Sequence, residues 1–170
     1  TIYYEGNFMY GHLILWICIF LSFPFSALAV SEGQLLIPFR AMDMSGESIN
    51  IEEYIGDKII VLAFWASWCP LCKSEVPLLN EIKDRFDPEK VVIFGINIDK
   101  NDSPSRARTF INKNSINYPV IYDQGSVITT SYKISGVPTV IITDRKGIIK
   151  FRKNYVPEVD RLDVIGGFVP

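Results

Sequence analysis

The segment Ile59–Phe86, which reads IIVLAFWASWCPLCKSEVPLLNEIKDRF, decides the fold of this chain. Its first part, Ile59–Trp65, is apolar throughout and rich in β-branched residues, which is typical of a strand buried on both faces of a sheet. From Pro70 to Phe86 apolar residues recur at helical spacing. The pattern predicts a buried strand that leads into a helix through two cysteines, Cys69 and Cys72.

The position of these cysteines at the start of a helix favours redox chemistry. Unpaired backbone N–H groups and the positive end of the helix dipole stabilise an anion there, so Cys69 is favoured as the thiolate that attacks disulfides. Cys72 lies one turn later on the same face, within reach of a mixed disulfide formed on Cys69. Pro70 suits the first helical turn, where its missing N–H costs nothing.

Three other interpretations of the cysteine pair are weaker. Half of a zinc site or an iron–sulfur site needs further Cys or His ligands, and the sequence after residue 29 contains none. A permanent structural disulfide with a three-residue link adds little chain constraint. We therefore expect a working dithiol pair, with no metal and no cofactor.

The overall composition limits the class of protein. With 170 residues, 48% of them hydrophobic, and a net charge of −2, the chain has enough apolar content for one packed domain. The near-neutral charge balance argues against a nucleic-acid partner. The one histidine, His12, lies in the first 29 residues, which argues against a His-based triad in the remaining chain, and a multi-His metal site needs more than one.

The flanking sequence alternates strand and helix patterns, which predicts an α/β sandwich ending in an antiparallel hairpin. Further strands are expected at residues 38–44, 48–51, 91–96, 119–122, 139–143 and 148–151. Further helices are expected at residues 103–113, 126–132 and 157–165, with one helical turn at 51–55. Gly147, in the turn between the last two strands, suits a positive φ.

The first 29 residues differ from the rest of the chain. Residues 13–25 are apolar and uncharged, and Ala27-Leu28-Ala29 follows them, which is typical of a signal peptide cleaved after Ala29. An uncleaved membrane anchor and a buried core helix are the alternatives, and no Lys or Arg precedes the run. We expect residues 1–29 to be a signal peptide or anchor and residues 30–170 to be one exported domain.

Residues 64–77, FWASWCPLCKSEVP, resemble the active-site stretch of the thioredoxin superfamily. The closer resemblance is to exported thiol–disulfide reductases of the TlpA/ResA type, including those that serve cytochrome c maturation. It implies a thioredoxin fold, with a central mixed β-sheet flanked by helices, an N-terminal β-hairpin extension and a short C-terminal helix.

A second match, Gly136-Val137-Pro138-Thr139, resembles the cis-proline loop that faces the cysteine pair in this superfamily. It implies that the Val137–Pro138 bond is cis and that the Val137 backbone pairs with a bound substrate chain. A plain turn before a strand is the alternative. Trp68 and Pro70 are expected at the rim where a substrate docks.

Two positions refine the resemblance. Cytoplasmic thioredoxins carry a buried Asp where this sequence has Ala63, and ResA-like reductases carry a Glu where it has Glu75. The match implies that Glu75 accepts or returns a proton as Cys72 attacks. The alternative for Glu75 is a solvated helix residue, since Glu is a common helix former.

Together with the apolar leader, the resemblance implies a periplasmic or extracytoplasmic disulfide reductase, secreted or tethered to the membrane. Its expected partners are disulfide-bearing proteins, with apocytochrome c as one candidate, and a thiol reductant donor in the membrane. A disulfide oxidase or isomerase and a non-catalytic binding domain are the alternatives. A peroxidase of the peroxiredoxin type is disfavoured, because that family needs Thr where this chain has Ala66.

Overall fold

A five-stranded sheet forms the centre of the molecule, and its middle strand is the apolar run before the cysteines. The computed structural model describes residues 30–162, and the strand order is β5-β4-β3-β6-β7. β3 runs parallel to β4 and antiparallel to β6, so the sheet is mixed, as predicted. The strands are β3 (Ile59–Trp65), β4 (Val91–Ile98), β5 (Val120–Asp123), β6 (Thr139–Thr143) and β7 (Ile149–Lys153).

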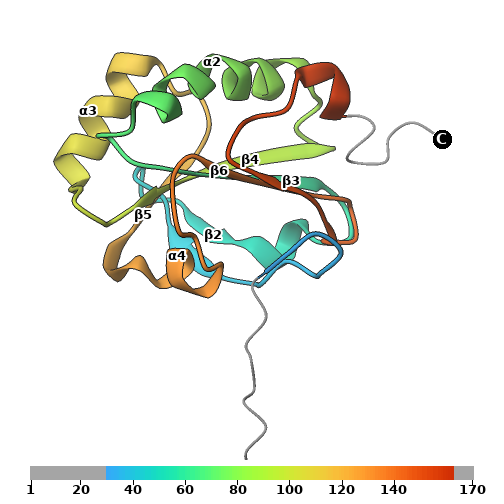
Figure 1. Cartoon of the computed structure of the whole chain (residues 1–170). Helices are drawn as coiled ribbons and strands as arrows, with labels where there is room; N and C mark the ends of the chain where they lie inside the picture. Colours follow the sequence, from blue (N-terminus) through green and yellow to red (C-terminus); the bar gives the residue numbers. More distant parts are fainter. Residues whose placement is uncertain (1–29, 163–170) are drawn as a thin grey trace, which may run out of the picture.

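Other elements cover both faces of this sheet (Figure 1). α2 and α3 lie together over one face of the sheet. α2 connects β3 to its parallel neighbour β4, and α3 connects β4 to its parallel neighbour β5, so both right-handed crossovers pass over the same face. The short α4 and the β1–β2 hairpin lie over the other face. These elements are β1 (Arg40–Met42), β2 (Ser48–Asn50), α2 (Pro70–Arg85), α3 (Pro104–Asn114) and α4 (Val127–Ser131). The predicted thioredoxin fold with its N-terminal hairpin is confirmed.

Aromatic side chains pack against the end of β3 on both faces of the sheet. Every residue of β3 is buried, and successive side chains point to opposite faces. The Trp65 ring stacks on Phe110 of α3, with ring centroids 4.7 Å apart. The Phe64 ring packs against Tyr132, with centroids 5.7 Å apart. This packing gives the residues that follow β3 a defined place.

In two of the strands that end at other residues than predicted, a polar side chain that forms hydrogen bonds lies at the difference. The strand predicted at residues 38–44 stops at Met42, because Asp43 starts a turn in which its carboxylate accepts the N–H groups of Ser45 and Glu47. β4 runs two residues beyond the predicted end and contains the fully buried Asn97. Gly147 has the expected positive φ, at +77°.

Within residues 30–162 the structure also has three short 3-10 turns, at η1 (Ile51–Tyr54), η2 (Gln124–Ser126) and η3 (Val159–Arg161). Of the helix predicted at residues 157–165, the structure gives only η3, and residues 163–165 lie outside the described part. η3 is tied to α2 by an ion pair of 2.6 Å between Arg85 and Asp160. The predicted signal peptide or anchor also lies outside the described residues. Within residues 30–162 no helix is long and apolar enough to cross a membrane.

Candidate active site

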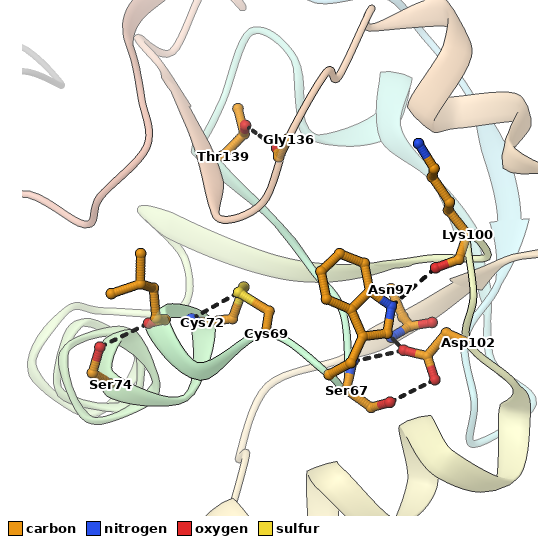
Figure 2. The surroundings of a disulfide bond; sticks show 11 residues. Ser67, Cys69, Cys72, Ser74, Asn97, Lys100, Asp102, Gly136 and Thr139 are labelled. Atoms are coloured by element: carbon orange, nitrogen blue, oxygen red, sulfur yellow. Dashed lines mark hydrogen bonds between the residues drawn. A yellow bond between two sulfur atoms is a disulfide. The ribbon is translucent and has the colours of Figure 1, made fainter.

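The cysteine pair lies at the point where β3 passes into α2. Cys69 is the N-cap residue of α2, and Pro70 occupies the first helical turn, as the sequence predicts. The two cysteines form a disulfide, with their Cα atoms 5.3 Å apart. The backbone N–H of Cys72 donates a hydrogen bond of 3.0 Å to the Sγ of Cys69 (Figure 2). This N–H donor and the helix dipole both stabilise negative charge on the Cys69 sulfur.

The two cysteines face different surroundings. Cys69 lines an open groove between the start of α2 and one side of α3. Cys72 does not line this groove and instead lines a small, partly enclosed pocket. A substrate can therefore approach Cys69 from the groove.

Glu75 and the proline loop line the same small pocket as Cys72. Glu75, Pro138 and Ala63 are among its lining residues, so α2, the loop before β6 and β3 all contribute to it. Glu75 is half-buried, and its Oε2 accepts a 2.7 Å hydrogen bond from the backbone N–H of Val156. The carboxylate is thus held near Cys72 rather than being fully solvated on the helix surface.

The loop before β6 has the conformation that the resemblance implied. The Val137–Pro138 peptide bond is cis, Pro138 is buried and Val137 is half-buried. The Thr139 hydroxyl donates a 2.7 Å hydrogen bond to the Gly136 carbonyl and closes the loop (Figure 2). This loop lies far from the cysteines in sequence, and its Pro138 lines the same pocket as Cys72.

Exposed apolar side chains surround the site. Trp68 is 50% exposed and Leu71 is 66% exposed, while Cys69 and Cys72 are 5% and 4% exposed. Pro70 is also exposed. These three side chains offer an apolar contact surface next to the buried sulfurs.

The sequence alone did not point to Asp102, which holds the loop before Cys69. The backbone N–H and the hydroxyl of Ser67 donate hydrogen bonds of 2.6 and 2.7 Å to the Asp102 carboxylate (Figure 2). Asn97 Nδ2 and the Ser103 N–H donate two more, each of 2.9 Å. The indole N–H of Trp68 donates to the carbonyl of Lys100, 3.0 Å away. The loop after β4 thus clamps the loop after β3.

The hydrogen bonds to Asp102 also set its charge state. The Asp102 side chain is fully buried, which by itself favours the neutral acid. The hydrogen bonds from Ser67 and Asn97 outweigh that effect and hold the pKa of Asp102 below its ordinary value. Asp102 is therefore a carboxylate that anchors the active-site loop at neutral pH.

Curated relatives of this chain include thiol–disulfide exchange proteins. The thioredoxin-like protein YneN of Bacillus subtilis is 28% identical over 122 residues, which cover 71% of this chain and 70% of YneN. The thiol-disulfide oxidoreductase ResA of Bacillus anthracis is 29% identical over 109 residues, covering 64% of this chain and 61% of that protein. The chain therefore spans less than two thirds of the length of this ResA relative.

Solved structures share the fold. StoA from Bacillus subtilis has a TM-score of 0.66 and 26% identity, covering 76% of this chain and 96% of StoA. A secreted Mycobacterium tuberculosis disulfide oxidoreductase homologous to E. coli DsbE has a TM-score of 0.65 and 24% identity, covering 77% of this chain and 96% of that one. The AhpC/TSA family model matches residues 33–152, well over half of the chain, and the chain therefore belongs to the AhpC/TSA family.

Proposed function

We propose that this chain is an exported thiol–disulfide oxidoreductase that reduces disulfide bonds in protein substrates. The observation that carries the proposal is the cysteine pair at the start of α2, with Cys69 on an open groove and Cys72 on a separate small pocket. Relatives named as thiol–disulfide oxidoreductases support it. Peroxidase chemistry of the peroxiredoxin type is disfavoured, because the buried residue three positions before Cys69 is Ala66, which carries no hydroxyl.

The reaction runs in two exchange steps. The Cys69 thiolate attacks one sulfur of the substrate disulfide, forms a mixed disulfide and releases the other substrate sulfur as a thiolate. Cys72, after losing its proton, attacks the Cys69 sulfur, forms the Cys69–Cys72 disulfide and releases the second substrate thiolate. Two electrons pass from the dithiol to the substrate, and both substrate thiolates take up protons.

Three neighbouring groups support these steps. Glu75 takes the proton from Cys72 as that sulfur attacks, which fits its place in the same pocket. The backbone of Val137 pairs with an extended substrate chain beside the disulfide. Trp68 and Pro70 provide exposed apolar surface against which the substrate packs.

The direction of exchange is reduction. Residues Pro70 and Leu71 separate the cysteines, so no His between them stabilises the thiolate and makes the pair more oxidising. An exported compartment is oxidising, so a thiol donor in the membrane returns electrons to Cys69 and Cys72. Apocytochrome c is the candidate substrate, and export rests on the apolar run and Ala27-Leu28-Ala29 in the first 29 residues.

The proposal is tested by a single-turnover reaction with the prereduced protein. We expect one disulfide of a model protein to be reduced per chain, with formation of the Cys69–Cys72 disulfide, as measured by mass spectrometry after acid quenching. Cys72→Ser is expected to stop at a mixed disulfide between Cys69 and the substrate. If the prereduced protein leaves the substrate oxidised while dithiothreitol reduces it, the proposed function is wrong.

Glu75→Gln is expected to slow the second exchange step by about 10²-fold, at the low end of the range for general acid–base catalysis. The amide oxygen of Gln can still accept the Val156 N–H, so the variant removes the proton acceptor and keeps the structural contact. Quenched-flow measurement separates mixed-disulfide formation, which should be unchanged, from its resolution.

Glu81→Gln is the matched control for this change, because Glu81 is an exposed acid on the same helix. It should leave both steps at the wild-type rate. Equal slowing of both steps in Glu75→Gln would show that Glu75 does not serve the attack of Cys72.

A further inference from the structure

We propose that the groove beside Cys69 binds an acidic segment of the substrate protein, so that the chain prefers disulfides flanked by Asp or Glu. This inference rests on the proposed disulfide exchange at Cys69, and it names the class of substrate that the exchange favours.

The groove is lined by cations from two helices. Lys73 comes from the first turns of α2, while Arg106 and Lys113 come from one side of α3. Among the described residues, no Asp or Glu lines the groove. A substrate segment that enters it meets positive charge on both walls.

The two lysines carry the uncompensated charge. The Arg106 Nε lies 3.5 Å from the buried Asp102 carboxylate, and its Nη2 donates to the carbonyl of Asn101. Lys73 and Lys113 are exposed, and within residues 30–162 neither side chain forms an ion pair. Their charges are therefore available to a partner, while Arg106 is already partly neutralised.

The remaining lining residues suit a peptide chain. Trp68, Pro70 and Phe110 add apolar surface to the groove, against which apolar parts of a substrate segment can pack. Cys69 lies in the same groove, so the segment that enters is continuous with the cysteine under attack.

The helix geometry sets the distance over which the acids matter. Arg106 and Lys113 are two turns apart on α3, which is about 10 Å at about 1.5 Å per residue. An extended peptide spans that length in about three residues. About three residues of an extended substrate therefore match the cationic stretch on α3, and the test peptides carry their acids within that length of the cysteine.

The test measures how fast the prereduced full chain reduces short peptide disulfides. Each peptide carries one Cys and is joined to its own copy, with Glu, Gln or Lys within three positions on both sides. Each rate constant is divided by the rate at which dithiothreitol reduces the same peptide, which removes intrinsic differences in reactivity. At low salt the Glu peptide should react about tenfold faster than the Gln peptide, and the Lys peptide should react slowest. The difference should shrink at high salt.

Reversal of the lysine charges tests whether the preference for acidic peptides arises in the groove. The double variant Lys73→Glu with Lys113→Glu should abolish or reverse the ratio between the Glu and Gln peptides. Lys146→Glu, in the exposed turn between β6 and β7, should leave that ratio unchanged. The ratio is informative even if the variants change the reactivity of Cys69, because such a change acts on all peptides.

The outcomes separate this inference from the function on which it rests. Two outcomes would show that the groove does not bind acidic segments: equal normalised rates for the three peptides, or an acidic preference that survives the double reversal. Either outcome would leave the proposed disulfide reduction intact. Failure of the prereduced chain to reduce any of the peptides would count against the proposed function itself, and the inference would fall with it.

Discussion

Replacement of Cys69 by serine is expected to abolish disulfide reduction, with a loss of about 10³-fold or more in the single-turnover rate. The thiolate is the nucleophile in disulfide exchange, and a serine hydroxyl is not ionised at neutral pH. Cys69 is also the cysteine that lines the open groove, whereas Cys72 does not, so we expect Cys72 not to take over the attack. The measurement is the rate at which substrate thiols appear after mixing with the prereduced variant.

The Cys69→Ser variant should keep its fold, because serine is a favoured N-cap residue and its hydroxyl oxygen can accept the Cys72 N–H. Its melting temperature should match that of the reduced wild-type protein within a few degrees. A folded variant that retains activity within about tenfold of the wild type would show that another group carries the first attack.

Replacement of Asp102 by alanine is expected to lower the free energy of unfolding by about 3 kcal/mol, which is large for one substitution. The buried carboxylate accepts hydrogen bonds from both the backbone and the hydroxyl of Ser67, as well as from Asn97 and Ser103. Alanine leaves these donors without their acceptor in a buried place, and each lost partner carries a desolvation cost. Urea denaturation of the oxidised protein measures the change.

The pH dependence of this loss gives a second readout. The pKa of Asp102 is lowered in the folded protein, so its stabilising effect is fully present above the ordinary Asp pKa of about 3.9. It is lost as the pH falls through the lower, folded value. The stability difference between wild type and Asp102→Ala should therefore be constant near neutral pH and shrink below about pH 4. A difference that does not change with acidification would show that the ionised carboxylate is not the anchor.

The part of the site that contains the two cysteines could be predicted from local sequence. β3 and α2 follow from an apolar run, a proline in the first helical turn and helical spacing, all of which are properties of neighbouring residues. The cysteines are therefore placed correctly at the start of α2. The proline loop was predicted only through the family resemblance, because nothing local in Val137–Pro138 requires a cis bond.

The supporting half of the site depends on distant contacts that local patterns do not encode. Asp102 and Ser67 are 35 residues apart, and they meet because parallel strands β3 and β4 end at the same edge of the sheet. The sequence predicts that this strand ends at Ile96, whereas Asn97 lies within β4 and is fully buried, with its amide donating to Asp102. The signal in the sequence was a polar residue after each of two neighbouring parallel strands, Ser67 after β3 and Asp102 after β4, which predicts that the two side chains lie close together.

The surroundings of Glu75 show the same limit. Its position one turn after Cys72 could be predicted from the spacing, but its partner is the backbone of Val156, 81 residues away. The sequence therefore left open a solvated helix residue, whereas the structure places the carboxylate partly buried beside Cys72.

The reduction potential of the Cys69–Cys72 pair tests the central proposal, a reductant of protein disulfides, most directly. The protein is equilibrated with thiol–disulfide buffers of known potential, and the oxidised fraction is measured by alkylation and mass spectrometry. The account predicts a value of about −250 mV or lower, close to that of known reducing thioredoxins. A value near about −120 mV would identify a strong oxidant and contradict the proposed direction of electron flow.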